Sequence, residues 1–233
     1  MIRFSNNLAK HWPILNDVKM SSNVCSHYGF NRRFNMVQDK NVWVEFNALT
    51  NKHKAVNLGQ GFPNYDSIKY LKNKSLEVAQ ELNNTFDQYT RSSGHLRLVN
   101  SVAKCYSSLM KREINPLSEV LISVGASNSL YNSFTSLLSE GDEVIIIEPF
   151  FDCYAPMSIT AGAKCVFVPL KPKTDREMTT SADWSWDTKE LEAAFSPKTK
   201  LIVINTPNNP LGKVYTREEL QQIADLCIKH NTL

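Results

Sequence analysis

Apolar residues recur along most of this 233-residue chain at spacings that predict alternating helices and strands. Helical spacing predicts helices over Val42–Phe46, Ser67–Leu82, Leu96–Met110, Ser127–Leu138, Phe151–Ala161, Asp187–Phe195 and Thr216–His230. Short, continuously apolar runs predict strands over Ala55–Leu58, Glu119–Val124, Glu143–Ile147, Cys165–Pro169 and Lys200–Asn205. The polar stretch Lys171–Ser185 predicts a loop. Strands that alternate with helices are typical of an α/β fold with a mostly parallel sheet.

The first 38 residues differ in composition from the rest of the chain. They are rich in Ser and Asn, and Asp17 is their one acidic residue. Their basic residues are Arg3, Lys10, Lys19, Arg32 and Arg33. A basic, acid-poor, Ser-containing N-terminus resembles a mitochondrial transit peptide, and a disordered extension with no targeting role explains it equally well. The expected location is therefore mitochondrial or cytoplasmic.

Composition and charge argue against several classes of function. The net charge is +3, with 42% hydrophobic and 21% charged residues, as in ordinary globular proteins. No run of Lys and Arg suggests binding to nucleic acid, and no apolar stretch approaches the ~20 residues of a membrane span. The five cysteines are odd in number and lack metal-ligand spacing, so we expect reduced thiols and no metal site.

The last predicted strand and helix form an open-ended unit. The strand Lys200–Asn205 leads into the helix Thr216–His230, which in a right-handed crossover returns to a further parallel strand. Only a few residues follow that helix. We therefore expect a sheet that is incomplete at its C-terminal end.

Three segments at the ends of predicted strands carry candidate chemistry. Ser123–Asn128 passes from a strand into a helix through small residues, where free N–H groups favour a phosphate, although an ordinary turn is the simpler interpretation. Glu148–Tyr154 contains aromatic rings that could stack on a planar cofactor or belong to the core. Asn205–Gly212 offers asparagine amides that can donate to a ligand oxygen, or forms only a proline-rich turn.

Taken together, these motifs resemble the fold-type I aminotransferases. The resemblance is strongest to the kynurenine aminotransferases, also called glutamine transaminase K or cysteine-S-conjugate β-lyases. The matching stretches are Val42–Phe46, Val56–Pro63, Asp87–Arg91, Glu140–Tyr154 and Asn205–Val214. The resemblance implies part of a large domain that binds pyridoxal phosphate over residues 66–233, with helices on both faces of the sheet. Residues 39–65 would form an N-terminal arm and substrate-side segment, and residues 1–38 the extension.

The resemblance also implies roles for particular residues on the cofactor side. Ala126 and Ser127 would supply backbone N–H groups to the cofactor phosphate. Phe151 would stack on the pyridine ring, and Asn209 would donate a hydrogen bond to its 3′-oxygen. Tyr89 would reach the cofactor of a neighbouring subunit, because family members are homodimers with shared sites.

On the substrate side, the resemblance implies that Gly61 touches the substrate carboxylate and that Trp43 walls the side-chain pocket. Pro149 and Pro210 match family positions that follow cis peptide bonds. The implied activity is transfer of an amino group from an aromatic or sulfur-containing amino acid, such as kynurenine, or from glutamine, to a 2-oxo acid. The same chemistry would allow β-elimination from cysteine S-conjugates.

The family's catalytic lysine has no counterpart in this sequence. The resemblance places the Schiff-base lysine after Leu233, and Lys213 belongs to a different motif. The chain by itself is therefore expected to be inactive. A non-catalytic truncated fragment, or a product that acts through dimer contacts, is the alternative. Ser127 and Asn128 also depart from the aromatic residue and the glycine that are usual in the family.

Overall fold

The computed structural model describes residue 33 and residues 42–61, 63–81, 87–173 and 179–233. The chain divides into two units, Met1–Gln38 and Asp39–Leu233. Apart from Arg33, the predicted transit peptide or extension lies outside the described residues. The description below therefore concerns the second unit.

A three-stranded parallel sheet forms the centre of this unit. Its strands are β1 (Glu143–Glu148), β2 (Lys164–Pro169) and β5 (Thr199–Val203), in the order β2-β1-β5. Helix α7 (Tyr154–Ala161) connects β1 to β2, and α8 (Thr188–Ala193) lies between β2 and β5 in the chain. The predicted alternation and parallel pairing are therefore confirmed. The predicted helix at Phe151–Ala161 begins later, at Tyr154.

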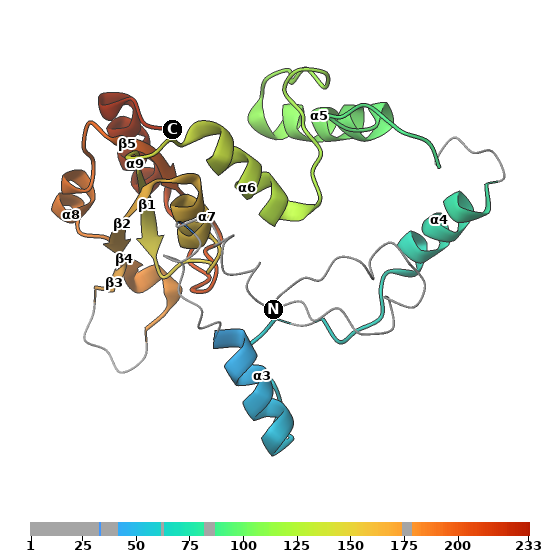
Figure 1. Cartoon of the computed structure of the whole chain (residues 1–233), viewed down its shortest axis with the longest axis horizontal. Helices are drawn as coiled ribbons and strands as arrows, with labels where there is room; N and C mark the ends of the chain where they lie inside the picture. Colours follow the sequence, from blue (N-terminus) through green and yellow to red (C-terminus); the bar gives the residue numbers. More distant parts are fainter. Residues whose placement is uncertain (1–32, 34–41, 62, 82–86, 174–178) are drawn as a thin grey trace, which may run out of the picture. The chain divides into compact units, whose positions relative to one another are not determined.

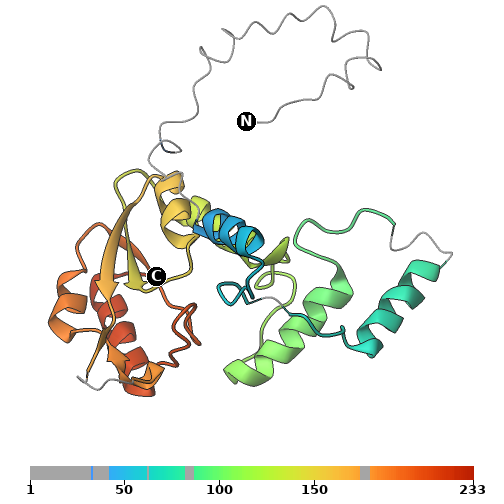
Figure 2. The same ribbon diagram turned by 90° about the horizontal axis from the view of Figure 1, so that it is seen from below.

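The central strand β1 is buried on both faces, which explains its continuous run of aliphatic residues. Ile145 and Ile147 belong to one core cluster, and Val144 and Ile146 belong to the other. The first cluster includes side chains of α8 and of α9 (Arg217–His230), and the second includes those of α7 and of α6 (Gly125–Leu137). Helices thus cover both faces of the sheet, as predicted (Figures 1 and 2).

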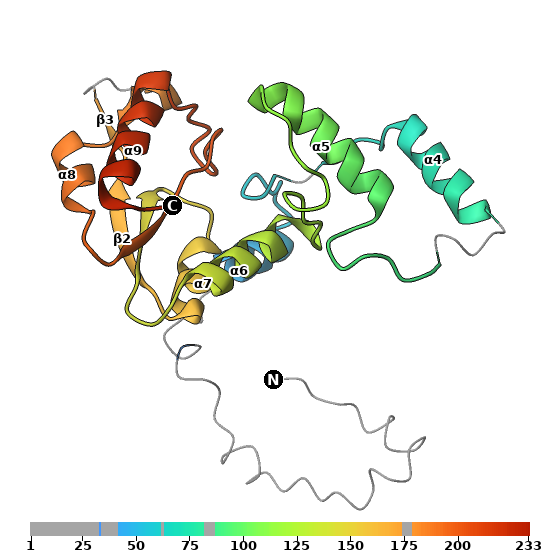
Figure 3. The same ribbon diagram turned by 90° about the horizontal axis from the view of Figure 1, so that it is seen from above.

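The helices around the sheet begin and end where their sequences provide caps. Thr216 and Glu219 form a capping box at the start of α9, and Asn231 ends it in a left-handed conformation. The Asp187 carboxylate accepts two backbone N–H groups at the start of α8. Helices α6 and α7 lie side by side on their face of the sheet (Figure 3).

After α9 the backbone returns to the edge of the sheet. The N–H of Leu233 donates to the carbonyl of Lys200 over 3.0 Å, and the N–H of Ile202 donates to the carbonyl of Leu233 over 2.9 Å. This alternation is the hydrogen-bond pattern of a parallel pair. The chain therefore reaches β5 from α9 as a crossover connection requires.

Within the described residues of the second unit, three further helices precede α6. They are α3 (Val42–His53), α4 (Lys69–Gln80) and α5 (Leu96–Met110). Helix α5 has the predicted bounds, whereas α3 is longer than the predicted segment. Helices α3 and α4 contain no buried residue, and α5 buries Val99 and Ala103.

Two predicted strands were wrong. Ala55–Leu58 is not a strand, and Val56 and Leu58 are 84% and 89% exposed. Glu119–Val124 is also irregular, although the N–H of Ile122 donates to the carbonyl of Ser93 over 3.0 Å. Apolar runs become strands only where a neighbouring strand accepts their hydrogen bonds, and the described residues provide none for these two segments.

The predicted loop Lys171–Ser185 contains regular structure at both of its ends. β3 (Lys171–Pro172) pairs in antiparallel fashion with β4 (Trp184–Ser185), and a short 3-10 helix, η2 (Ser181–Asp183), precedes β4. Within the described part of the chain, no helix is long and apolar enough to cross a membrane.

Candidate functional site

A cavity of about 650 Å³ lies at the carboxyl ends of β1 and β5, where parallel sheets commonly bind ligands. Its volume is typical of sites for small molecules and cofactors. It is lined by Val42, Trp43, Gly59, Gln60, Gly61, Phe150, Phe151, Asp152, Asn209 and Pro210. The structure therefore brings together Trp43, Gly61, Phe151 and Asn209, which the sequence places far apart.

The loop after β1 is held by aromatic packing. The Phe150 ring stacks on that of Phe167 in β2, with centroids 5.6 Å apart. The Phe151 ring meets Tyr154 edge to face at 5.8 Å. Both Phe rings pack against the core cluster beneath them and also line the cavity. The rings of Phe150 and Phe151 can therefore be part of the core and also contact a cofactor, so the two interpretations of this segment do not exclude each other.

The loop after β5 contains two adjacent asparagines with different environments. The buried Asn208 amide donates to the carbonyl of Pro149 over 3.2 Å and accepts the N–H of Leu211 over 3.0 Å. Asn209 is exposed, and its backbone N–H donates to the Asn205 side chain over 2.7 Å. Among the described residues, nothing forms a hydrogen bond with the Asn209 amide. Asn208 closes the turn, and Asn209 is available to a ligand.

The peptide bonds before the loop prolines have the predicted geometry. Glu148–Pro149 and Asn209–Pro210 are both cis, as the resemblance implied. Thr206–Pro207 is also cis, which the sequence analysis did not predict.

A buried lysine holds the far end of the second loop. The Lys213 side chain is 2% exposed, and its Nζ lies 3.0 Å from Oε1 of Glu219. The same Nζ lies 5.4 Å from the centre of the Tyr215 ring. The other oxygen of Glu219 accepts the N–H of Thr216 over 2.9 Å. This cluster was not predicted from the sequence, although a capping-box glutamate near a lysine, as at Glu219 and Lys213, is a local signal for such a pair.

The N-terminal arm reaches the cavity through Trp43. The indole Nε1 of Trp43 donates to the carboxylate of Asp152 over 2.7 Å, which joins α3 to the loop after β1. The glycine turn is fastened to the same helix, because Asn57 accepts the N–H of Gly59 at 2.9 Å and donates to Asn47 of α3 at 3.1 Å. Asp152 is a residue of the site that the sequence analysis did not identify.

Three predicted residues do not line this cavity. Ala126 and Ser127 are exposed in the first turn of α6, where backbone N–H groups have no partner within the helix. Nearby, the Asn128 side chain accepts the N–H of Val124 over 3.2 Å. Tyr89 is fully exposed at 104%. Their cofactor roles remain predictions.

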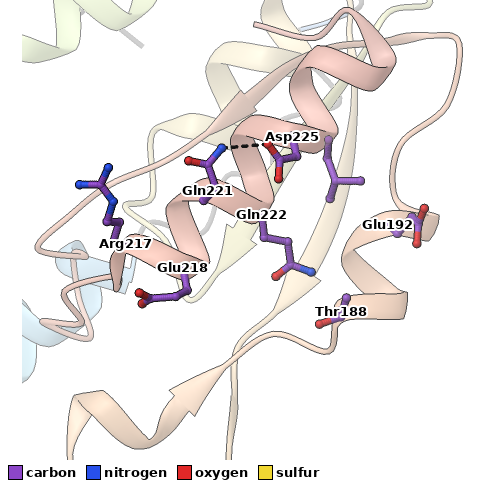
Figure 4. Close-up of a pocket in the computed structure, with 8 residues that line it drawn as sticks. Thr188, Glu192, Arg217, Glu218, Gln221, Gln222 and Asp225 are labelled. Atoms are coloured by element: carbon purple, nitrogen blue, oxygen red, sulfur yellow. Dashed lines mark hydrogen bonds between the residues drawn. The ribbon is translucent and has the colours of Figure 1, made fainter.

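A second hollow of about 540 Å³ lies between α8 and α9 (Figure 4). It shares no lining residue with the cavity and contains none of the predicted site residues. Polar side chains of α9 dominate it, and Gln221 and Asp225 bind each other over 2.8 Å. In the described part of the chain, no cluster of His, Cys, Asp and Glu could hold a metal ion.

Comparison with known families gives a match that covers most of the chain. The family model for aminotransferase class I and II matches residues 53–233. Kynurenine--oxoglutarate transaminase 3 of Mus musculus is 53% identical over 196 residues, which are 84% of this chain and 43% of the mouse protein. Kynurenine--oxoglutarate transaminase 1 of Homo sapiens is 45% identical over 197 residues, which are 84% of this chain and 46% of the human protein.

Solved structures give the same answer for the fold. Bna3p of Saccharomyces cerevisiae has a TM-score of 0.79 at 35% identity, over 88% of this chain and 50% of that protein. N-Succinyldiaminopimelate aminotransferase of Mycobacterium tuberculosis has a TM-score of 0.75 at 32% identity, over 88% of this chain and 50% of that protein. The chain spans about half the length of the relatives that it matches.

Proposed function

The chain belongs to the class I and II aminotransferases, and on that premise we propose that it contributes to pyridoxal-phosphate-dependent transamination. The proposed donors are kynurenine, glutamine and other amino acids with aromatic or sulfur-containing side chains, and the acceptor is a 2-oxo acid. β-Elimination from cysteine S-conjugates is a further proposed reaction of the same site.

One observation carries this proposal. Three groups converge on one cavity at the strand ends: the Phe151 ring, the glycine turn at Gly61, and the Asn209 amide, which has no hydrogen-bond partner among the described residues. A planar heterocycle with an anionic oxygen needs a flat apolar contact and a hydrogen-bond donor. The chemistry of these groups therefore fits the pyridine ring of the cofactor.

The residues of this chain would each perform a limited task. Phe151 would lie against the cofactor ring, and Asn209 would donate to its 3′-oxygen. The first-turn N–H groups of Ala126 and Ser127 would bind the phosphate, since a helix N-terminus favours an anion. When bound, the cofactor supplies the electron sink that stabilises the substrate carbanion.

On the substrate side, Gly61 would contact the substrate carboxylate and Trp43 would cover the substrate side chain. We further propose a homodimer in which Tyr89 reaches the neighbouring subunit's site. Its full exposure leaves it accessible for such a contact.

A binding experiment tests the cofactor site without requiring turnover. The probe is 4′-deoxypyridoxine 5′-phosphate, which keeps the ring, the 3′-oxygen and the phosphate but forms no Schiff base with lysine. We expect Asn209→Ala to weaken its binding about 10- to 100-fold, because a hydrogen bond to a charged group contributes roughly 1.5–3 kcal/mol. Asn100→Ala, on the exposed surface of α5, is the control and should bind as the wild type does.

The opposite result is equally clear. Unchanged affinity with a lowered melting midpoint in Asn209→Ala would assign that residue to the turn alone. Turnover requires a separate assay, with kynurenine or glutamine, a 2-oxo acid and added cofactor. Because the Schiff-base lysine is expected outside these 233 residues, we expect no turnover above the free-cofactor background. That outcome would leave the non-catalytic alternative open for the chain by itself.

A further inference from the structure

Lys213 is a buried charged residue close in sequence to the cavity but not part of its lining. Among the described residues, it is the one charged side chain that is almost completely buried. Its Nζ lies 3.0 Å from Oε1 of Glu219 and 5.4 Å from the centre of the Tyr215 ring. Compared with an apolar pair of the same size, a buried ion pair often adds little stability, because two charges have left water. Stability alone therefore does not account for a lysine at this position.

The backbone of Lys213 closes the loop that presents Asn209. The Lys213 carbonyl accepts the N–H of Asn208 over 2.8 Å, and the N–H of Gly212 donates to the Asn208 carbonyl over 2.7 Å. The Asn208 side chain also accepts the N–H of Leu211 over 3.0 Å. Asn209 therefore lies in a short loop whose two ends are hydrogen-bonded to each other, so a movement of Lys213 also moves Asn209.

The side chain of Lys213 fixes this closed loop to helix α9. Its partner Glu219 is held at the start of the helix, because its Oε2 accepts the N–H of Thr216 over 2.9 Å and its own N–H donates to the Thr216 hydroxyl over 3.2 Å. Helix α9 in turn packs on the sheet through Ile223 and Leu226. The ion pair thus connects the loop to a helix that is packed on the core.

We propose that Lys213 is a positioning residue, which holds the Asn209 amide where it can donate to the 3′-oxygen of the bound cofactor. A buried charge has few arrangements in which it keeps its partner, so the ion pair with Glu219 selects one conformation of the loop. An apolar side chain of the same size would accept several. The inference rests on the proposed function, because it concerns the geometry of a cofactor contact.

The test follows binding of 4′-deoxypyridoxine 5′-phosphate by two readouts. Calorimetry on the 233-residue chain gives the dissociation constant, and absorbance as a function of pH gives the midpoint at which the 3′-oxygen of the bound probe ionises. A hydrogen-bond donor at the 3′-oxygen favours its ionised form and lowers that midpoint. Misplacement of Asn209 should therefore weaken binding and also raise the midpoint. A loss of stability alone moves neither quantity in the folded chain.

The informative variant replaces both members of the ion pair, because Lys213→Met by itself leaves Glu219 without its partner and risks unfolding the chain. Lys213→Met combined with Glu219→Gln removes both charges and keeps an acceptor for the N–H of Thr216. No unpaired charge is buried, so we expect the chain to stay folded. We expect binding of the probe to weaken roughly three- to tenfold and the midpoint to rise by about half a pH unit.

Coupling to Asn209 separates positioning from a general loss of structure. In a chain that carries Asn209→Ala, the combined substitution at Lys213 and Glu219 should cause no further change in affinity or midpoint, because no amide remains to be placed. Val99→Ala is the control for stability. It removes volume at a buried position of α5, outside the cavity, and should lower the melting midpoint without changing the ionisation of the bound probe.

The outcomes distinguish the inference from the function on which it rests. If Asn209→Ala weakens binding of the probe but the folded variant at Lys213 and Glu219 has wild-type affinity and midpoint, Lys213 serves the fold only and the positioning proposal is wrong. Changes that persist undiminished in the Asn209→Ala chain would mean that Lys213 acts through another group, which also overturns it. If a cooperatively folded wild type binds no probe, the cofactor site itself is wrong and the inference falls with it.

Discussion

The segment from β1 to α9 and the segment from α3 to α5 use similar apolar spacing and reach different degrees of burial. In the first segment, Leu191 of α8 and Ile223 of α9 are almost fully buried against β1. In the second, α3 and α4 bury no residue. The comparison shows that an apolar stripe is enough to predict a helix, while burial requires a second surface. The two faces of β1 provide that surface.

The cavity is lined by residues of both segments. We therefore expect the two sets of lining residues to differ in how firmly the structure holds them. Phe151 and Asn209 follow strands of the packed sheet, whereas Trp43 and Gly61 belong to the exposed arm. Groups on the packed side should keep their geometry when the arm is perturbed. Pairs of substitutions, one at a buried interaction and one at an exposed interaction of the same kind, test how much burial contributes to stability.

The largest effect is expected from the buried ion pair of Lys213. Lys213→Ala leaves Glu219 without its buried partner, so we expect a loss of about 3–5 kcal/mol in the free energy of unfolding. Lys229→Ala, also on the packed segment, breaks an exposed pair with Glu192 and should cost about 1 kcal/mol or less. Urea unfolding followed by tryptophan fluorescence measures both. Equal losses in the free energy of unfolding for the two variants would show that burial does not make the Lys213 pair more stabilising than the exposed pair.

A slightly smaller effect is expected when the two segments are compared directly. Ile146→Ala in β1 creates a cavity in a core cluster and should cost about 2–5 kcal/mol. Leu71→Ala in α4, whose side chain is 56% exposed, should lie within about 0.5 kcal/mol of the wild type. Chemical denaturation at several protein concentrations is the measurement. A large, concentration-dependent loss in Leu71→Ala would mean that α4 is covered in solution by another copy.

The adjacent asparagines offer a finer comparison within one loop. Asn208→Ala removes the bond to the Pro149 carbonyl and leaves the N–H of Leu211 unpaired, which should cost about 1–3 kcal/mol. Asn209→Ala removes an exposed amide and should change stability by about 0.5 kcal/mol or less. Melting midpoints of the two variants give the ordering. If Asn209→Ala lowers the melting midpoint more than Asn208→Ala does, the assignment of the structural role to Asn208 and the ligand-binding role to Asn209 is reversed.

The smallest effect is a dependence on alkaline pH. Burial, with the Glu219 charge second, raises the pKa of Tyr215 to about 12. The Asn208 amide opposes this rise, although no hydrogen bond of acceptable geometry joins it to the buried hydroxyl. The folded protein therefore holds the phenolic proton more tightly than the unfolded chain, whose tyrosine pKa is about 10.

This contribution to stability is complete below pH 10 and is lost as the pH rises toward 12. At pH 11 the expected loss is about 1 kcal/mol. Tyr215→Phe should lack this component of the decline between pH 9 and pH 11 in urea unfolding. An identical decline in the variant and the wild type would rule out Tyr215 as its source.

The sequence predicted the packed segment well because its signals are local. The aliphatic runs of β1, β2 and β5 and the capping box of α9 identify their elements without reference to distant residues. The same kind of signal wrongly predicted a strand at Val56 and Leu58. A strand also needs a neighbouring strand to pair with, and the spacing of apolar residues does not show whether one is present.

Residues of the candidate site could be predicted only where they belong to a sequence motif of the family. Phe151, Asn209, Gly61 and Trp43 were named from the resemblance, and the structure places all four at one cavity. Their cofactor and substrate roles stay predictions. Asp152 was not predicted as a site residue because its partner, Trp43, is 109 positions away, and no local sequence pattern indicates so distant a contact.

That separation has a consequence for the order of events during synthesis. At about 5–20 residues per second, the ribosome adds the 109 positions between Trp43 and Asp152 in roughly 5–20 s. Throughout that interval Asp152 is absent, so the contact that joins α3 to the loop after β1 cannot form before that loop has been synthesised.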